Sequence, residues 1–176
     1  MSDLKSLIRT IPDFPKPGIQ FRDVTTLFAD ASGFAQMIDA FVARYAKRGI
    51  TKVAAIEARG FILGGPIAHG IGAGFVPVRK KGKLPGESFG VDYALEYGTD
   101  RIEIHVGALV AADVVLVVDD LIATGGTATA AIKLVEASGA KVHEACFIVD
   151  LPELGGAKKI EAAGHTTFSL VAFEGH

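Results

Sequence analysis

Five apolar residues followed at once by two carboxylates constrain this chain more than any other feature. The run Val114–Val118 is β-branched except for Leu116, which is typical of a strand buried on both faces of a parallel sheet. Asp119 and Asp120 come next, where such a strand leaves the sheet. Because ligands of open α/β sheets bind just beyond the carboxyl ends of the strands, we expect a binding site at this position.

A glycine-containing turn completes this motif. Thr124, Gly125, Gly126 and Thr127 lead into a helical pattern, and a turn of this kind offers an anion free backbone N–H groups and the positive end of a helix dipole. The two carboxylates before it are acceptors only, so they suit hydroxyl groups or a metal. Together the two halves indicate a sugar phosphate. The turn is not a P-loop, because no Gly-Lys-Ser/Thr sequence follows it. It is not a dinucleotide-binding fingerprint either.

Strand patterns and helix patterns alternate along the rest of the chain. Further strands are expected at 52–56, 75–79, 142–149 and 167–173, and helices at 32–48, 61–71 and 127–138. A short helix that Ser2 would cap is expected to carry Leu4, Leu7, Ile8 and Ile11. This alternation predicts βαβ units, a mainly parallel sheet and one α/β domain over residues 1–176 without a linker.

Composition and charge exclude several classes of protein. With 49% hydrophobic and 22% charged residues, the chain has a globular composition rather than a disordered one. A net charge of −2 argues against broad nucleic-acid binding by charge alone. No apolar run reaches membrane-spanning length and no signal-peptide core is visible, so we expect a cytoplasmic protein. The single cysteine, Cys146, cannot form an internal disulfide and is expected in the core.

Two further segments suit anions at the same end of the expected sheet. Arg59 and Gly60 follow the strand at 52–56, and a guanidinium fork matches phosphate oxygens. A plain turn with a surface salt bridge is the alternative, but a second anion loop nearby favours pyrophosphate binding. Arg79, Lys80 and Lys83 belong to the densest positive cluster of the chain. Such a cluster is often only a solvated loop, yet this one directly follows a strand.

The region after that cluster is expected to be a loop and then a β-hairpin. Residues 80–92 are rich in Gly, Lys and Pro, which predicts a loop long enough to be functional or disordered. Residues 94–97 and 101–106 are expected to form the two arms of the hairpin. Glu96 would lie on its first arm, where it is either a surface residue or part of a site.

Taken in order, these motifs resemble a known family. Asp119 and Asp120 with residues 123–127 closely resemble the phosphoribosyl pyrophosphate (PRPP) loop of the type I phosphoribosyltransferases. Segments 21–25, 57–61, 76–85 and 95–98 occur in the order found in the adenine-specific members of that family. The resemblance covers nearly the whole chain. It implies a twisted, mainly parallel sheet flanked by helices, an N-terminal base-binding hood at about 1–30, and a flexible catalytic loop and hairpin at about 80–100.

The resemblance also implies a reaction and its site residues. PRPP and adenine would give AMP and pyrophosphate in purine salvage, with Mg²⁺ held mainly by PRPP and water and no certain protein ligand. The ribose hydroxyls are assigned to Asp119 and Asp120, and the 5-phosphate to Ala123, Thr124, Gly125, Gly126 and Thr127. Pyrophosphate is assigned to Arg59, Gly60, Arg79, Lys80 and Lys83, adenine to Phe21, Arg22 and Leu151, and acid–base catalysis to Glu96. The family also implies a homodimer, with no nucleic-acid or membrane partner.

Two other functions stay open at this point. One is a phosphoribosyltransferase for a different purine or for orotate. The other is a regulator that senses PRPP without catalysis, which would need a basic surface or an added DNA-binding domain. Phe21 is also ambiguous, because a large aromatic in a short extended segment (residues 19–23) packs into the core unless a ligand covers it.

Overall fold

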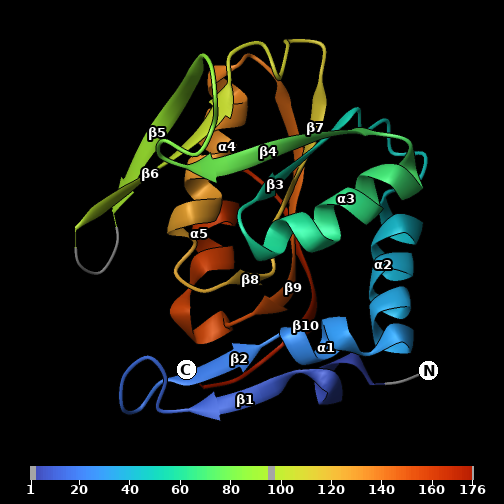
Figure 1. Cartoon of the computed structure of the whole chain (residues 1–176), viewed down its shortest axis with the longest axis vertical. Coiled ribbons are helices and arrows are strands. Elements are labelled where there is room, and N and C mark those ends of the chain that lie inside the picture. Colours follow the sequence, from blue (N-terminus) through green and yellow to red (C-terminus); the bar gives the residue numbers. More distant parts are fainter. Residues whose placement is uncertain (1–2, 95–97, 176) are drawn as a thin grey trace.

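A seven-strand path forms the central sheet of the computed structural model, which describes residues 3–94 and 98–175 (Figure 1). From one edge to the other the strands are β10 (Thr167–Ala172), β9 (Lys141–Asp150), β7 (Val114–Val118), β3 (Lys52–Ile56), β4 (Gly74–Lys80), β6 (Thr99–His105) and β5 (Ser88–Ala94). A short β8 (Leu121–Ile122) also pairs with β9. The first five are parallel, and β4, β6 and β5 pair antiparallel. The predicted mainly parallel sheet is confirmed.

Helices cover both faces of this sheet. One face packs against α2 (Ala31–Tyr45) and α3 (Arg59–Ile71), and the other against α4 (Gly126–Ala137) and α5 (Gly156–Ala162). The strand β3 shows the consequence, because Val53 and Ala55 belong to the first core and Ala54 to the second, all three at 0% exposure. A strand covered on both sides needs apolar residues at every position. The unbroken apolar run of β7 has the same explanation.

The N-terminal residues form a separate small layer below the main sheet. It consists of η1 (Leu4–Leu7), β1 (Arg9–Pro12), β2 (Gln20–Asp23) and α1 (Thr25–Ala29). The expected helix ends at Leu7, and its extension to Ile11 is wrong, because Ile11 lies in β1 opposite Phe21 of β2. Asp3 caps η1 by accepting a hydrogen bond from the backbone N–H of Lys5. The expected cap, Ser2, lies outside the described residues.

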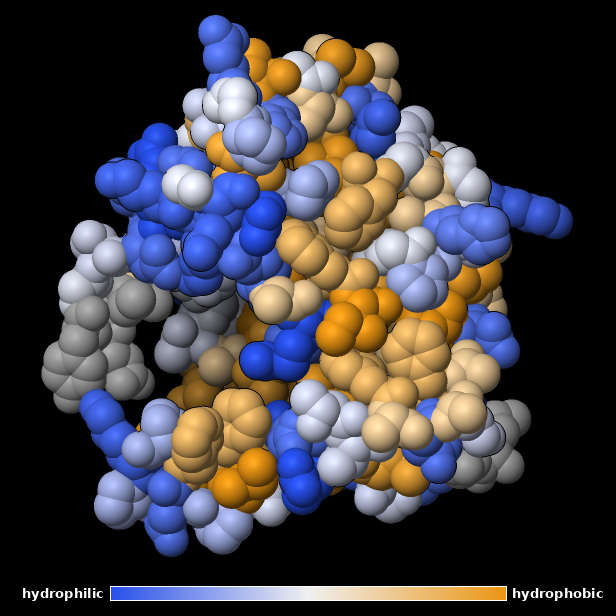
Figure 2. Space-filling model, viewed as in Figure 1, coloured by the Kyte–Doolittle hydropathy of each residue, from blue (hydrophilic) through white to orange (hydrophobic). Residues whose placement is uncertain are grey.

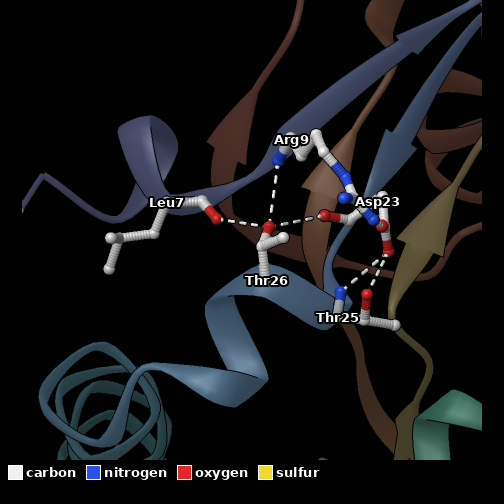
Figure 3. Close-up of polar contacts among 5 residues, drawn as sticks. All are labelled: Leu7, Arg9, Asp23, Thr25 and Thr26. Atoms are coloured by element: carbon white, nitrogen blue, oxygen red, sulfur yellow. Dashed lines mark hydrogen bonds and ion pairs between the residues drawn. The ribbon is translucent and has the colours of Figure 1, made fainter.

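A polar network fastens β1 and β2 to α1 (Figure 3). The Asp23 carboxylate accepts hydrogen bonds from Arg9 and from the Thr25 hydroxyl, the latter at 2.6 Å. The Thr26 hydroxyl donates to the Leu7 carbonyl at 2.7 Å and accepts from the Arg9 backbone N–H at 3.1 Å. The Thr25 hydroxyl and the Arg9 guanidinium together lower the pKa of Asp23, although burial of the carboxylate raises it. The network therefore fixes the strand that carries Phe21.

The predicted loop at 80–92 is too long. Residues 88–92 belong to β5, which pairs with β6 along its whole length, from Ser88 opposite His105 to Ala94 opposite Thr99. Phe89, Val91 and Tyr93 alternate along β5 and pack on the α4 side of the sheet. This period of two is typical of a half-buried strand, but glycine and charged residues between them hide it. The first arm of the hairpin is therefore 88–94, and residues 95–97 lie outside the described part.

Within residues 3–94 and 98–175, no helix is long and apolar enough to cross a membrane.

Candidate active site

The residues that follow three neighbouring parallel strands meet at one edge of the sheet. Glu57 follows β3, Asp119 follows β7 and Leu151 follows β9. A cavity of about 550 Å³ lies there, and β2 closes it from the N-terminal layer. Its lining residues are Ile19, Gln20, Phe21, Arg22, Arg59, Tyr93, Ala94, Leu121, Ala123, Thr124, Gly126, Thr127, Leu151 and Leu154. The cavity therefore lies beyond the carboxyl ends of these strands, where the motif predicts a binding site.

One end of the cavity is a mainly apolar slot. Phe21 and Arg22 of β2 line it, together with Leu151 and Leu154 from the turn around η2 (Pro152–Leu154). Phe21 is only partly buried and belongs to neither core, although its ring meets that of Phe14 edge to face at 5.2 Å between centroids. The structure thus brings the three expected base-binding residues together and does not place Phe21 in the core.

The other end is the turn between β8 and α4. Gly125 has a left-handed φ of 76°, and a Cβ atom there would lie 2.9 Å from the Gly156 carbonyl oxygen, so only glycine fits. The Gly156 backbone N–H donates to the Ala123 carbonyl at 3.0 Å and braces the turn from α5. No side chain caps the start of α4, which leaves the first N–H groups of this 12-residue helix available for an anion.

A second hollow of about 120 Å³ lies directly over this turn. It is lined by Asp119, Leu121, Ile122, Ala123, Thr124, Gly125, Gly126, Thr127 and Ala128. All five residues assigned to the 5-phosphate are therefore at its surface, with Asp119 on its rim. The arrangement places a carboxylate next to an anion-binding turn, as the motif predicts.

The two adjacent carboxylates have different environments. Asp120 is buried at 6% exposure and forms an ion pair with Arg59. Its backbone N–H donates to Oδ1 of Asp119 at 2.9 Å. Burial, together with the neighbouring charge of Asp120, raises the pKa of Asp119 well above its usual range. The Arg59 guanidinium therefore holds Asp120, whereas Asp119 is the carboxylate that lines the hollow over the turn.

Arg59 and Gly60 begin α3 beside these carboxylates. The Arg59 side chain is 47% exposed and lines the main cavity while it holds Asp120. Gly60 serves close packing, because a Cβ there would lie 2.9 Å from the carbonyl oxygen of Val118 and 3.3 Å from Cα of Asp119. The structure therefore brings the start of α3 against the end of β7 and places one of the cations expected to bind pyrophosphate, Arg59, at the cavity.

Two of the remaining expected cations, Arg79 and Lys80, lie at the end of β4 and are paired with acids of neighbouring segments, and Lys83 follows three residues after the strand. Arg79 donates to Glu57 and to the Lys83 carbonyl, at 3.0 Å in each case. Lys80 is bonded to Asp100 and to the Tyr93 hydroxyl. None of Arg79, Lys80 and Lys83 is among the residues that line the 550 Å³ cavity. Figure 2 shows hydrophilic residues gathered at the upper left, the part of the molecule where Figure 1 places β5 and β6. Glu96, the expected acid–base residue, lies outside the described residues.

The described part of the chain offers no cage for a metal ion. Within residues 3–94 and 98–175 there is no group of three His, Cys, Asp or Glu side chains that could hold one. Beside the turn of residues 123–127, the candidate metal ligands are the carboxylate oxygens of Asp119 and Asp120. Mg²⁺ is commonly bound by one or two carboxylates plus substrate phosphates, so these residues fit Mg²⁺ brought by a phosphorylated substrate.

Several lining residues were not found from the sequence. Tyr93 was missed because most of β5 is expected from the sequence to be a loop, and Ala94 is expected only as the start of the hairpin arm at 94–97. Gln20 adjoins Phe21 in the extended segment, and Leu154 follows Leu151 by three residues in a turn. A signal for Leu154 was present, since an apolar residue recurs one 3₁₀ turn after Leu151 at the ligand end of β9.

Comparisons with known proteins agree with this geometry. A family model described as the phosphoribosyl transferase domain matches residues 26–168. An adenine phosphoribosyltransferase from Methylobacillus flagellatus is 61% identical over 172 residues, covering 98% of each chain. The chain belongs to the adenine phosphoribosyltransferase family. Another member, from Maricaulis maris, is 64% identical over 173 residues, covering 98% of this chain and 99% of its own.

Solved adenine phosphoribosyltransferases share the whole fold. The crystal structure from Thermoanaerobacter pseudethanolicus has a TM-score of 0.92 at 47% identity and covers 97% of this chain and 98% of its own. The Saccharomyces cerevisiae enzyme, complexed with an imino-altritol bisphosphate and adenine, has a TM-score of 0.90 at 40% identity, with 96% and 97% coverage. Membership in the family thus extends from sequence to architecture, and the predicted fold class is confirmed.

Proposed function

We propose that this chain transfers the phosphoribosyl group of PRPP to adenine, giving AMP and pyrophosphate in purine salvage. One observation carries the proposal: the glycine-containing turn before α4 and the apolar side chains of Phe21, Leu151 and Leu154 line a single cavity, and a smaller hollow lies over the turn itself. The Saccharomyces cerevisiae relative was crystallised with adenine and a bisphosphate. The Trypanosoma brucei relative was crystallised with AMP, pyrophosphate and ribose-5-phosphate.

At the phosphate end, the turn of residues 123–127 would hold the 5-phosphate through backbone N–H groups and through the hydroxyls of Thr124 and Thr127. Asp119 and Asp120 would accept hydrogen bonds from the ribose hydroxyls. In the reaction, the bond from the anomeric carbon to pyrophosphate breaks and a bond to an adenine nitrogen forms, while that nitrogen loses its proton. Holding the ribose at both ends aligns the two reactants for this displacement.

The leaving pyrophosphate needs positive charge. We assign pyrophosphate binding to Arg59 and Gly60 at the start of α3, and to Arg79, Lys80 and Lys83 at and just after the end of β4. Arg59 already lines the cavity, whereas Lys80 has to leave Asp100 and Tyr93 to reach it. Mg²⁺ held mainly by PRPP and water would neutralise charge that develops on the leaving group.

At the base end, Phe21 and Leu151 would cover the two faces of adenine. The backbone around Phe21 and Arg22 would bind its polar edge, because β2 lies along the slot. Glu96 is proposed as the acid–base residue. Residues 1–30 would act as the base-binding hood, and residues 80–100 as the catalytic loop and hairpin, within one domain over 1–176.

We also propose a homodimer in the cytoplasm. Ile62 and Phe75 are 43% and 40% exposed on α3 and β4, and the Phe61 ring meets that of Phe75 at 5.7 Å. Figure 2 shows an apolar surface over α3. Exposed apolar side chains that lie together are typical of an interface. A partner subunit at this surface would bring Arg79 of one subunit close to the pyrophosphate site of the other.

Light scattering at micromolar concentration should give twice the mass of 18.4 kDa, and a fully active monomer would contradict the dimer. The cytoplasm is the compartment where the proposed substrates occur.

An assay of PRPP and Mg²⁺ with each of adenine, hypoxanthine, guanine and orotate tests the function. We expect AMP from adenine and little product from the other bases. Turnover of another base instead of adenine would make the chain a different phosphoribosyltransferase. Binding of PRPP without turnover of any base would favour a PRPP-sensing regulator.

A further inference from the structure

The segment 173–175, which follows β10, contacts both walls of the base end of the cavity. We propose that this segment is a clamp that positions Arg22 and Leu151 for adenine, so that the contacts of Phe173, Glu174 and Gly175 set the affinity for the base. The inference rests on the proposed function. Figure 1 shows the C-terminus beside β2, at the same end of the molecule as the N-terminal layer.

The first wall is β2, and Arg22 is the residue that the clamp holds. The Arg22 guanidinium carbon lies 4.6 Å from the centroid of the Phe173 ring, within the range of a cation–π contact. The terminal nitrogen Nη2 of Arg22 donates to the Glu174 carbonyl at 3.2 Å, and Nη1 donates to the Thr10 hydroxyl at 2.6 Å. Two of the three groups that orient this side chain therefore come from the clamp. Arg22 Nε is buried without a hydrogen-bond partner in the described part of the chain.

The second wall is the turn that carries Leu151 and Leu154. The Phe173 backbone N–H donates to the Asp150 carbonyl at 3.0 Å, one residue before Leu151. The Gly175 backbone N–H donates to Oε1 of Glu153 at 3.0 Å, between the two leucines. The three clamp residues therefore connect two walls that lie far apart in the sequence, β2 with Arg22 and the turn with Leu151.

The phosphate end is braced by different contacts. The Gly156 backbone N–H holds the Ala123 carbonyl, and Gly125 packs on Gly156. The hydrogen bonds and ring contacts of residues 173–175 go to η1, β2, β9 and η2 rather than to this turn. Loss of the clamp should therefore weaken binding of the base and leave binding of the sugar phosphate nearly unchanged. General destabilisation of the fold would weaken both.

Two variants of the full chain test the clamp. Phe173→Ala removes the ring that faces Arg22. Gly175→Pro removes the N–H that Glu153 accepts from and imposes a φ near −65° where the chain has 77°, at a position beyond the last strand. Each variant is titrated with AMP and with ribose 5-phosphate. For Phe173→Ala, loss of a cation–π contact and disorder of its partner should raise the Kd for AMP by about fivefold to fiftyfold, with a smaller rise for Gly175→Pro. The Kd for ribose 5-phosphate should stay the same.

Lys5→Ala is the matched control. The Lys5 ammonium lies 4.8 Å from the same Phe173 ring but contacts neither wall of the slot, so its replacement should leave both affinities unchanged. Phe173→Tyr keeps the ring and should restore AMP binding. The clamp is refuted if Phe173→Ala and Gly175→Pro leave AMP binding unchanged, or if they weaken both ligands equally. Failure of the wild-type chain to make AMP would instead overturn the proposed function.

Discussion

The phosphate end and the base end of the cavity are built in opposite ways. Five consecutive residues, 123–127, form the phosphate turn, and the two carboxylates lie only a few positions before them. The base end combines β2, the turn after β9 and the segment 173–175, which lie far apart in the chain. A phosphate is recognised by backbone groups that one local turn can supply, whereas a flat base needs two opposed faces. The chain can build opposed faces only by bringing distant segments together.

The largest expected effect concerns the phosphate end. Replacing Asp119 and Asp120 together with Ala should lower kcat/KM for PRPP by about 10²–10⁴-fold, because hydrogen bonds to charged groups contribute roughly 1.5–3 kcal/mol each. Steady-state kinetics on both single variants and the double variant would measure this.

Asp113→Asn is the matched control for these variants. Asp113 is buried at 7% exposure and precedes β7 at the opposite end of the same strand. Its replacement should affect stability while kcat/KM per folded molecule stays the same. Wild-type PRPP dependence in all three site variants would remove the carboxylates from the site.

A second prediction concerns the residue that would act on the base. Glu96→Gln should lower kcat by about 10²–10⁴-fold, the usual contribution of a positioned acid or base, while adenine affinity changes much less. Single-turnover measurements of chemistry together with equilibrium binding of adenine would separate the two. Turnover close to wild type would mean that Glu96 is a surface residue.

The third prediction tests whether the base end is a binding slot or part of the core. Phe21→Ala should weaken adenine binding by about 1–3 kcal/mol, the range for base–aromatic stacking, with little change in thermal stability. Phe41, which is 0% exposed, is the matched aromatic of the core. Phe41→Ala should instead lower the free energy of unfolding by about 3–5 kcal/mol without changing affinity per folded molecule. The reverse pattern would contradict the assignment.

The smallest expected effect is on stability and depends on pH. Burial raises the pKa of Asp119, so the native state binds its proton more tightly than the unfolded state does. The stabilisation that this proton provides is complete below about pH 4, the unperturbed value, and is lost as the pH rises through the raised pKa. Asp119→Asn should therefore melt at a higher temperature than wild type near neutral pH, and the difference should shrink toward pH 4. A difference that is independent of pH would contradict this.

The same contrast explains what could be predicted from the sequence. The strands β3 and β7 and the turn before α4 were predicted because periodicity and turn chemistry are local properties. Phe21 and Leu151 were assigned only through the family resemblance, since nothing local distinguishes a base-stacking aromatic from a core one. The expected helix through Ile11 was wrong because pairing with β2 outweighs the helical spacing. The strand β5 was missed because its apolar residues are interrupted by glycine and charge.

The most direct test of the account is a calorimetric titration of two variants with ribose 5-phosphate and with AMP. The double variant Thr124→Val and Thr127→Val alters the phosphate end, and Phe21→Ala alters the base end. We predict that the threonine variant weakens both ligands by the same factor, whereas Phe21→Ala weakens AMP and leaves ribose 5-phosphate unchanged. Equal weakening of both ligands by Phe21→Ala, or full ribose 5-phosphate affinity in the threonine variant, would contradict the division of the site into two separately built ends.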